Sequence, residues 1–112
     1  MKNDLSGPMI EKVVERLRAL ADESRVRILL RLERGECNVT TLAAELGLAQ
    51  ATASKHLGVL RRAGLVAVRR EGTRTLCSVR DRSVFEMCEL VCGGVRRHLE
   101  EERAALALTP RQ

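Results

Sequence analysis

Four thiols and one basic stretch are the parts of the sequence that could do chemistry. The thiols belong to Cys37, Cys77, Cys88 and Cys92, and the basic stretch runs from Leu46 to Arg70. Cys88 and Cys92 are four residues apart, so on a helix their sulfurs would share one face. Such a pair can bind one soft ion or exchange with one disulfide partner. Cysteine is also among the most buried residue types, so the same pair could be a small apolar filler.

The basic stretch contains no acidic residue. From Leu46 to Arg70 there is no Asp or Glu, although the chain has 15 of them, and five cations lie within it: Lys55, Arg61, Arg62, Arg69 and Arg70. A charge run of this kind can be a solvated face. An acid-free surface is also what a polyanionic partner requires, because phosphates would repel carboxylates. The net charge of +5 favours a nucleic-acid partner as well.

The composition is that of one small globular domain. The chain has 112 residues, 45% of them hydrophobic and 31% charged. Phe85 is its only aromatic residue, which disfavours single-strand binding by base stacking. We find no signal peptide and no apolar run of the ~20 residues that a membrane span needs, so we expect a cytoplasmic protein with reduced thiols. An enzyme is not expected, because Cys88 and Cys92 lack Cys-x-x-Cys spacing and no nucleophile–base arrangement is visible.

Apolar periodicity and capping residues predict four helices before residue 64. An amphipathic helix follows an arm of residues 1–8, a second helix begins after Asp22, and a third begins after Asn38. Glycines end the second and third helices. The fourth runs from about residue 50 to 63, and its inward stripe is Ala53, Leu57 and Leu60.

A hairpin and a long helix complete the predicted elements. Two alternating runs, LVAVRR at 65–70 and RTLCSV at 74–79, flank Gly72 and predict two antiparallel strands. The last helix, from about 82 to 107, has one apolar seam: Val84, Cys88, Val91, Val95 and Leu99. This seam is longer than a small domain can cover alone, so we interpret it as a dimer interface.

Two short helices joined by a tight turn and followed by a hairpin make a winged helix-turn-helix. We therefore predict a mainly α fold of the α+β class, with five helices and a two-stranded wing. The homodimer is expected to form through the first and last helices. Residues 1–8 would be a flexible arm, 9–107 the DNA-binding and dimerisation domain, and 108–112 a tail.

The acid-free stretch maps onto the helix after the turn and onto the first wing strand. A helix that enters the major groove needs small or polar side chains near its N-terminus, with cations beside it to neutralise phosphates. The residues predicted to contact DNA are Gln50, Thr52, Ser54, Lys55, His56, Arg61, Arg62, Arg69, Arg70 and Arg74. For His56 a hydrogen bond within the helix packing, or to a phosphate, is the alternative to reading a base.

Three segments together resemble the ArsR/SmtB family of winged helix-turn-helix repressors: ALADESRVRILLRL, TLAAELGLAQATASKHLGVLRRAGLV and RREGTRTLCSV. They occur in the family's order and spacing, and the resemblance covers roughly residues 10–105. It implies a dimer that represses its operator and releases it when an inducer binds. It also implies that residues 50–56 lie on the DNA-reading helix, with Arg70 and Arg74 on the wing. Ala49 departs from the family pattern, which usually has a Ser N-cap there.

The family's metal sites do not carry over to this sequence. Its arsenic site has two cysteines at the positions of Asn38 and Thr40, and Cys37 lies one residue early. Its zinc site on the last helix is matched in its second half by His98 and Glu101, but Met87 stands where an earlier ligand should be.

A site made only of thiols remains. Cys37, Cys88 and Cys92, within one chain or across the dimer, could bind As(III) or Sb(III), and a fourth thiolate would suit Cd(II), Pb(II) or Zn(II). The same thiols could instead switch by disulfide or polysulfide formation. Cys77 is expected to pack in the wing. We therefore predict a repressor released by a thiol-sensed inducer, with a redox-responsive repressor and a regulator without any small-molecule inducer as alternatives.

Overall fold

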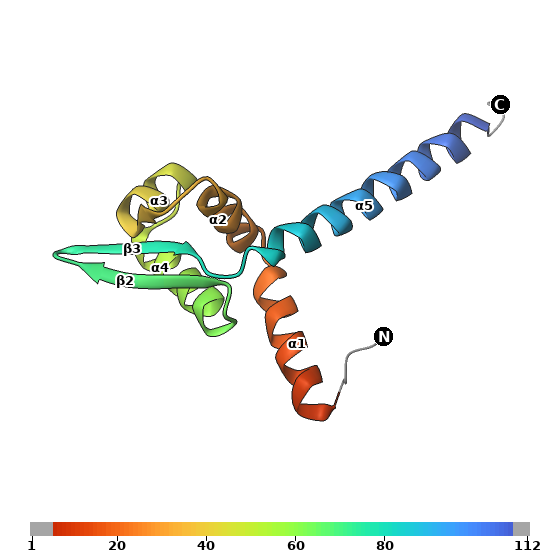
Figure 1. The fold of residues 1–112 in the computed structure, drawn as a ribbon. Coiled ribbons are helices and arrows are strands. Elements are labelled where there is room, and N and C mark those ends of the chain that lie inside the picture. The colour runs from red at the N-terminus through yellow and green to blue at the C-terminus, as the bar shows by residue number, and fades with distance from the viewer. Residues whose placement is uncertain (1–5, 109–112) are drawn as a thin grey trace. The chain divides into compact units, whose positions relative to one another are not determined.

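The computed structural model describes residues 6–108, which divide into two compact units between Asp81 and Arg82. In its described part the first unit contains helices α1 (Gly7–Leu20), α2 (Glu23–Glu33), α3 (Val39–Leu46) and α4 (Gln50–Arg62), as Figure 1 shows. It also contains strands β1 (Cys37–Asn38), β2 (Val66–Glu71) and β3 (Arg74–Val79). The second unit is one helix, α5 (Ser83–Leu108). Five helices with this order confirm the predicted winged helix-turn-helix.

The helices begin where the capping residues predicted. The Asp22 side chain accepts a hydrogen bond of 3.1 Å from the backbone N–H of Arg25, and the Asn38 side chain accepts one of 2.7 Å from that of Thr41. Helix α1 differs from the prediction, because it begins at Gly7 inside the expected arm, with proline in its first turn. Proline is well accommodated there, since the first helical N–H groups have no intrahelical acceptor. The rest of the predicted arm, 1–5, and most of the predicted tail, 109–112, lie outside the described residues.

The core of the first unit lies between α2, α3, α4 and the sheet. Helix α4 contacts α3 and β2, and α2 contacts β3. Its largest fully buried side chains come from these elements and from the connection between α4 and β2: Ile28, Leu29, Leu32, Leu42, Leu60, Leu65, Val66 and Cys77. The predicted inward stripe of α4 is confirmed, because Ala53, Leu57 and Leu60 are all buried.

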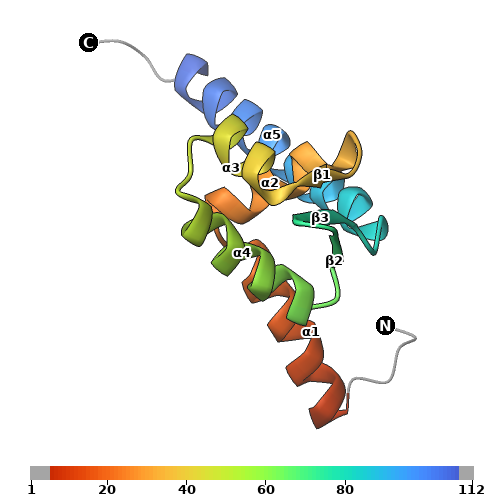
Figure 2. The same ribbon diagram turned by 90° about the vertical axis from the view of Figure 1, so that its left-hand side faces the viewer.

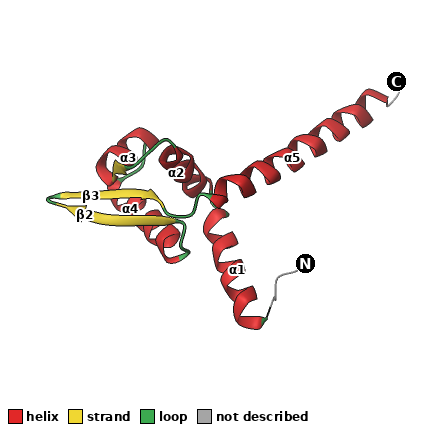
Figure 3. Cartoon of the chain, viewed as in Figure 1, coloured by secondary structure: helices red, strands yellow, loops and turns green. Residues whose placement is uncertain are grey.

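The sheet has three strands rather than the predicted two. Its order is β1-β3-β2 with both pairings antiparallel, so β3 lies in the middle. Figure 2 shows β1 beside β3, and Figure 3 shows the hairpin of β2 and β3 in yellow. Gly72 makes the predicted turn with φ 63°, a left-handed conformation that glycine adopts without strain. The third strand was missed because two residues are too few to display an alternating pattern.

One arginine of α1 joins three segments that are far apart in the chain. Arg16 Nε donates to the carbonyl oxygen of Ala63 at 3.2 Å, and its Nη1 lies 2.7 Å from Oδ2 of Asp81. Ala63 caps α4, and Asp81 follows the wing. Arg16 therefore attaches α1 both to the end of α4 and to the segment that follows β3.

Helix α5, taken by itself, carries an exposed apolar face. Val91, Val95 and Leu99 are 62%, 53% and 55% exposed, whereas Val84, the first residue of the predicted seam, is buried. The helix spans Ser83–Leu108, one residue later at each end than predicted. None of the described helices is both long enough and apolar enough to cross a membrane.

Cys37 and Cys77 are partners across the β1–β3 pairing and both are buried. The Cys77 thiol donates to the backbone carbonyl of Cys37 at 3.3 Å. Burial, with a further contribution from the Cys37 thiol, raises the pKa of Cys77 to about 12. Cys77 therefore packs in the wing, as predicted, and Cys37 packs beside it.

The four thiols should differ in their reactivity toward an alkylating reagent. In the folded protein at pH 8, iodoacetamide should modify the exposed Cys92 first, while Cys77 should stay unmodified. Alkylation requires the thiolate, and a pKa of about 12 leaves almost none of it at Cys77. Mass-spectrometric mapping over time measures the order, and unfolding in guanidinium should make all four thiols react. Alkylation of Cys77 as fast as Cys92 in the folded protein would contradict this structure.

Candidate nucleic-acid interface

Helix α4 turns its polar side chains toward solvent. Gln50, Thr52, Ser54 and Lys55 are exposed, and so are Arg61 and Arg62 in its last turn. The buried stripe lies on the opposite face, because residues four and seven positions apart share one side of a helix. No acid lies in the first turn of α4. The exposed face of this helix can therefore approach a polyanion, because its side chains there are small or polar and none is acidic.

The turn between α3 and α4 has the geometry of a helix-turn-helix. Gly47 caps α3 in the left-handed conformation, φ 66° and ψ 31°, and its N–H bonds back to the helix. Ala49 then caps α4 with extended backbone but without a side-chain hydrogen bond. Alanine has no oxygen to offer, so the first N–H groups of α4 lack the side-chain acceptor that serine would supply.

A polar hollow of ≈ 360 Å³, which we call the wing hollow, lies where α3, α4 and the wing meet. Its walls are Asn38, Val39, Thr40, Gln50, Arg70, Thr73, Arg74 and Thr75. The starts of α3 and α4 both contribute, so the positive ends of two helix dipoles are near it. No acidic residue lines it. Two arginines, hydroxyls and helix N-termini are the groups that hold phosphate oxygens in protein–DNA complexes.

His56 has a hydrogen-bond partner within the protein. It is half-buried, and its Nδ1 lies 3.3 Å from Nη1 of Arg25. Arg25 also donates to the carbonyl oxygens of Ala19 at 2.6 Å and Arg18 at 3.2 Å. Arg25 therefore ties the end of α1 to the middle of α4. No periodic pattern in the sequence indicates this contact, although Arg25 ends the ADESR segment within the residues that carry the family resemblance.

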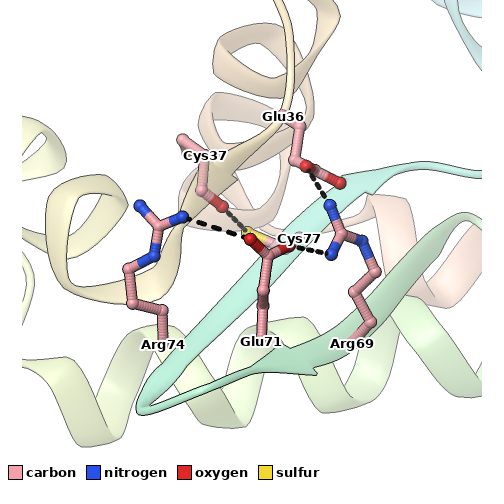
Figure 4. Close-up of polar contacts among 6 residues, drawn as sticks. All are labelled: Glu36, Cys37, Arg69, Glu71, Arg74 and Cys77. Carbon is pink, nitrogen blue, oxygen red and sulfur yellow. Dashed lines mark hydrogen bonds and ion pairs between the residues drawn. The ribbon is translucent and has the colours of Figure 1, made fainter.

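Arg69 and Arg74, both predicted to contact phosphates, lie in a cluster with two glutamates (Figure 4). Arg69 is within 2.6 Å of Glu36 and 2.5 Å of Glu71, and Arg74 is 3.6 Å from Glu71. The hydrogen bond from Arg69 is the main cause that lowers the pKa of Glu71. Arg70 and Lys55, by contrast, are exposed and have no acidic partner among residues 6–108.

The predicted sensing thiols fall into separate places. Cys88 is half-buried and Cys92 is exposed, one turn apart on α5. Cys37 lies in β1 beside Cys77, the cysteine that the predicted thiol site left out. No disulfide joins the four, and residues 6–108 contain no group of three or more metal-binding side chains in one chain. His98 on α5 pairs with Glu102 at 2.9 Å rather than with Glu101.

Comparison with known proteins finds transcriptional regulators. Residues 20–69 match a family model described as a helix-turn-helix domain. The HTH-type transcriptional regulator CmtR of Mycobacterium bovis is 40% identical over 92 residues, 78% of each chain.

Solved structures agree with the fold. The homodimeric winged helix-turn-helix DNA-binding domain Mb0332 of Mycobacterium bovis, described as a possible ArsR-family regulator, has a TM-score of 0.76 and 34% identity. That match covers 89% of this chain and 93% of the other. Reduced HlyU of Vibrio cholerae, a protein named as a transcriptional activator, has a TM-score of 0.65 and 38% identity, over 73% of this chain and 86% of that one.

These relatives are regulators and not enzymes, in agreement with the sequence prediction. The matched region contains α3, the turn and α4, which carry the exposed polar face and one side of the wing hollow. The chain is a DNA-binding transcriptional regulator of the ArsR/SmtB family, with the winged helix-turn-helix fold of that family.

Proposed function

We propose that the protein is a cytoplasmic repressor that reads its operator with the exposed face of α4 and binds the flanking phosphates with the wing. The observation that carries this proposal is the acid-free surface formed by α4 and the wing hollow. Gln50, Thr52, Ser54 and Lys55 are placed to meet base edges, since side chains near the start of a recognition helix do so in the major groove. Arg61 and Arg62, in the last turn of α4, and Arg70 on the wing are exposed and suited to phosphates.

Replacing Lys55 and Arg70 by alanine should separate base reading from phosphate binding. Arg70→Ala should weaken binding to operator and random duplexes alike, with a salt dependence shallower by about one unit. Lys55→Ala should cost about 1–3 kcal/mol on the operator and little on random DNA, because only a base contact depends on sequence. Fluorescence anisotropy over a salt series measures both. Equal losses on the two duplexes for Lys55→Ala would reject its base-reading role.

The apolar faces of α1 and α5 support a homodimer. On α1, Met9, Ile10, Val13 and Leu17 are between 41% and 49% exposed, and on α5 the face of Val91, Val95 and Leu99 is also exposed. Monomeric proteins seldom leave continuous apolar stripes in water. The similar domain from Mycobacterium bovis is homodimeric. A two-fold dimer would place two copies of α4 about 34 Å apart, the spacing of successive major grooves in a palindromic operator.

Val91→Asp should disrupt this dimer. The substitution would bury one carboxylate in each protomer at the α5 interface, a change that costs far more than a surface charge does. Sedimentation at micromolar concentration should show a dimer for the natural chain and monomer or unfolded protein for the variant. Glu89→Gln, on an exposed position of the same helix, is the control and should stay dimeric. A natural chain that sediments as a stable monomer would refute the interface.

The inducer is proposed to act through the thiols of α5. Cys88 and Cys92 lie one turn apart, with Cys92 exposed, so a soft ion such as As(III), Sb(III) or Cd(II) could be held by both. Thiols from the second protomer, or Cys37, would complete the three or four ligands that these ions prefer. Since HlyU has been solved in a reduced form, a redox or polysulfide response is the second candidate. A regulator that has no small-molecule inducer is the third.

Cys88→Ser and the double change Cys88→Ser with Cys92→Ser should abolish operator release by the inducer. A coupling of about 3 kcal/mol would weaken operator binding roughly a hundredfold in the natural chain. Anisotropy with As(III), Sb(III), Cd(II), Zn(II), peroxide or polysulfide identifies which species releases DNA. Without inducer the variants should bind within about threefold of the natural chain, since serine has nearly the volume of cysteine.

Cys77→Ala is the matched control for that experiment and should keep the response to inducer, because Cys77 is fully buried. Release of DNA by the double serine variant would end the thiol-sensor proposal for α5. Failure of every species to release the natural chain would favour a regulator without a small-molecule inducer.

A further inference from the structure

Two carboxylates lie directly beside the arginines of the wing. Glu71 is the last residue of β2, and Glu36 immediately precedes β1, so the strand β3 lies between them. Arg69 reaches both, with Nη2 2.6 Å from Glu36 Oε1 and Nη1 2.5 Å from Glu71 Oε2. Arg74 shares Glu71 through an ion pair of 3.6 Å. Figure 4 shows Glu71 between the two guanidinium groups.

The four charges of this cluster sum to zero. Two arginines of the wing are thereby balanced by two glutamates, whereas Arg70 has no acidic partner in the described part of the chain. Arg70 lies on the other face of β2, because successive side chains of a strand alternate. The three arginines near the hairpin turn, taken together with Glu71 and Glu36, therefore carry a net charge of one.

We propose that Glu36 and Glu71 limit the affinity of the wing for DNA by competing with phosphates for Arg69 and Arg74. This inference rests on the proposed function and adds to it two residues that set the sequence-independent affinity of the wing. Phosphate contacts carry no sequence information, so each one that is withheld lowers the sequence-independent share of binding. The contacts of α4 with base edges then make up a larger fraction of the total.

The two arginines differ in how firmly they are held. Arg69 has two carboxylate partners at hydrogen-bond distance, and Arg74 has one at a longer distance. All four side chains are partly exposed, between 38% and 58%, so these are surface pairs that water and salt weaken. Arg74 also lines the wing hollow, whereas Arg69 does not. Removing Glu71 alone should therefore release Arg74, and removing both glutamates should release Arg69 as well.

The test compares Glu71→Gln and the double variant Glu36→Gln with Glu71→Gln against the natural chain. Each released arginine should steepen the salt dependence of binding to a random duplex by about one unit and raise affinity roughly threefold at low salt. Binding to the operator should rise by the same factor, so the ratio of operator to random affinity should stay unchanged. Glutamine keeps the shape of glutamate, and melting curves matching the natural chain verify the fold.

Glu33→Gln is the control for net charge. Glu33 is exposed at the end of α2 and has no ion pair among residues 6–108, so this change adds the same charge without releasing an arginine. It should leave the salt dependence unchanged. As a second control, Arg74→Ala introduced into the Glu71→Gln chain should remove the gain.

Two results would overturn the inference. One is the same gain for Glu33→Gln as for Glu71→Gln, which would mean that net charge alone matters. The other is weaker binding of the glutamine variants, which would mean that the cluster shapes the wing for DNA. Failure of the proposed function is distinguishable from both, because the natural chain would then bind neither duplex, or Lys55→Ala would lose nothing on the operator.

Discussion

Helix α4 is held in place by Ala53, Leu57 and Leu60, three side chains that are at most 3% exposed. Their packing fixes the rotation of the helix about its own axis. Since each residue of a helix turns by about 100°, a shift of one position would bring polar groups such as Ser54 into the core. Burying a hydroxyl without a hydrogen-bond partner costs roughly 1–3 kcal/mol, and this cost disfavours the rotated helix. The buried side chains of α4 thus determine which face of the helix is exposed.

The basic residues of the first unit fall into two groups, those bound by other groups of the protein and those open to solvent. Arg16, Arg25, Arg31 and Arg69 are engaged by carboxylates, carbonyl oxygens or His56 within the protein. Arg70 and Lys55 remain open to solvent. A sequence shows the number of cations but not which of them already has a partner. For this reason the net charge of +5 indicates less about DNA binding than does knowing which cations are paired within the protein.

Much of the fold was predictable because its signals are local. Asp22 and Asn38 cap helices within three residues of themselves, and Gly72 makes the turn where it stands. The missed features depend on contacts distant in sequence: β1 pairs with β3 across 40 residues, and Arg69 meets Glu36 across 33. Of the site, the exposed face of α4 followed from periodicity. The contact of Arg25 with His56 and the pairing of Cys37 with Cys77 could not be predicted, because no periodic pattern in the sequence indicates either contact.

The attachments of Arg16 have a consequence for how the chain folds as it is synthesised. The partners of Arg16 come 47 and 65 residues later, at Ala63 and Asp81. Helix α1 therefore leaves the ribosome well before its anchoring points exist, and its docking waits for contacts of high sequence separation. Until then α1 can contact α2, whose Arg25 donates to the carbonyl oxygens of Arg18 and Ala19, but it cannot contact α4. The contacts of Arg16 with Ala63 and Asp81 are accordingly among the last to form.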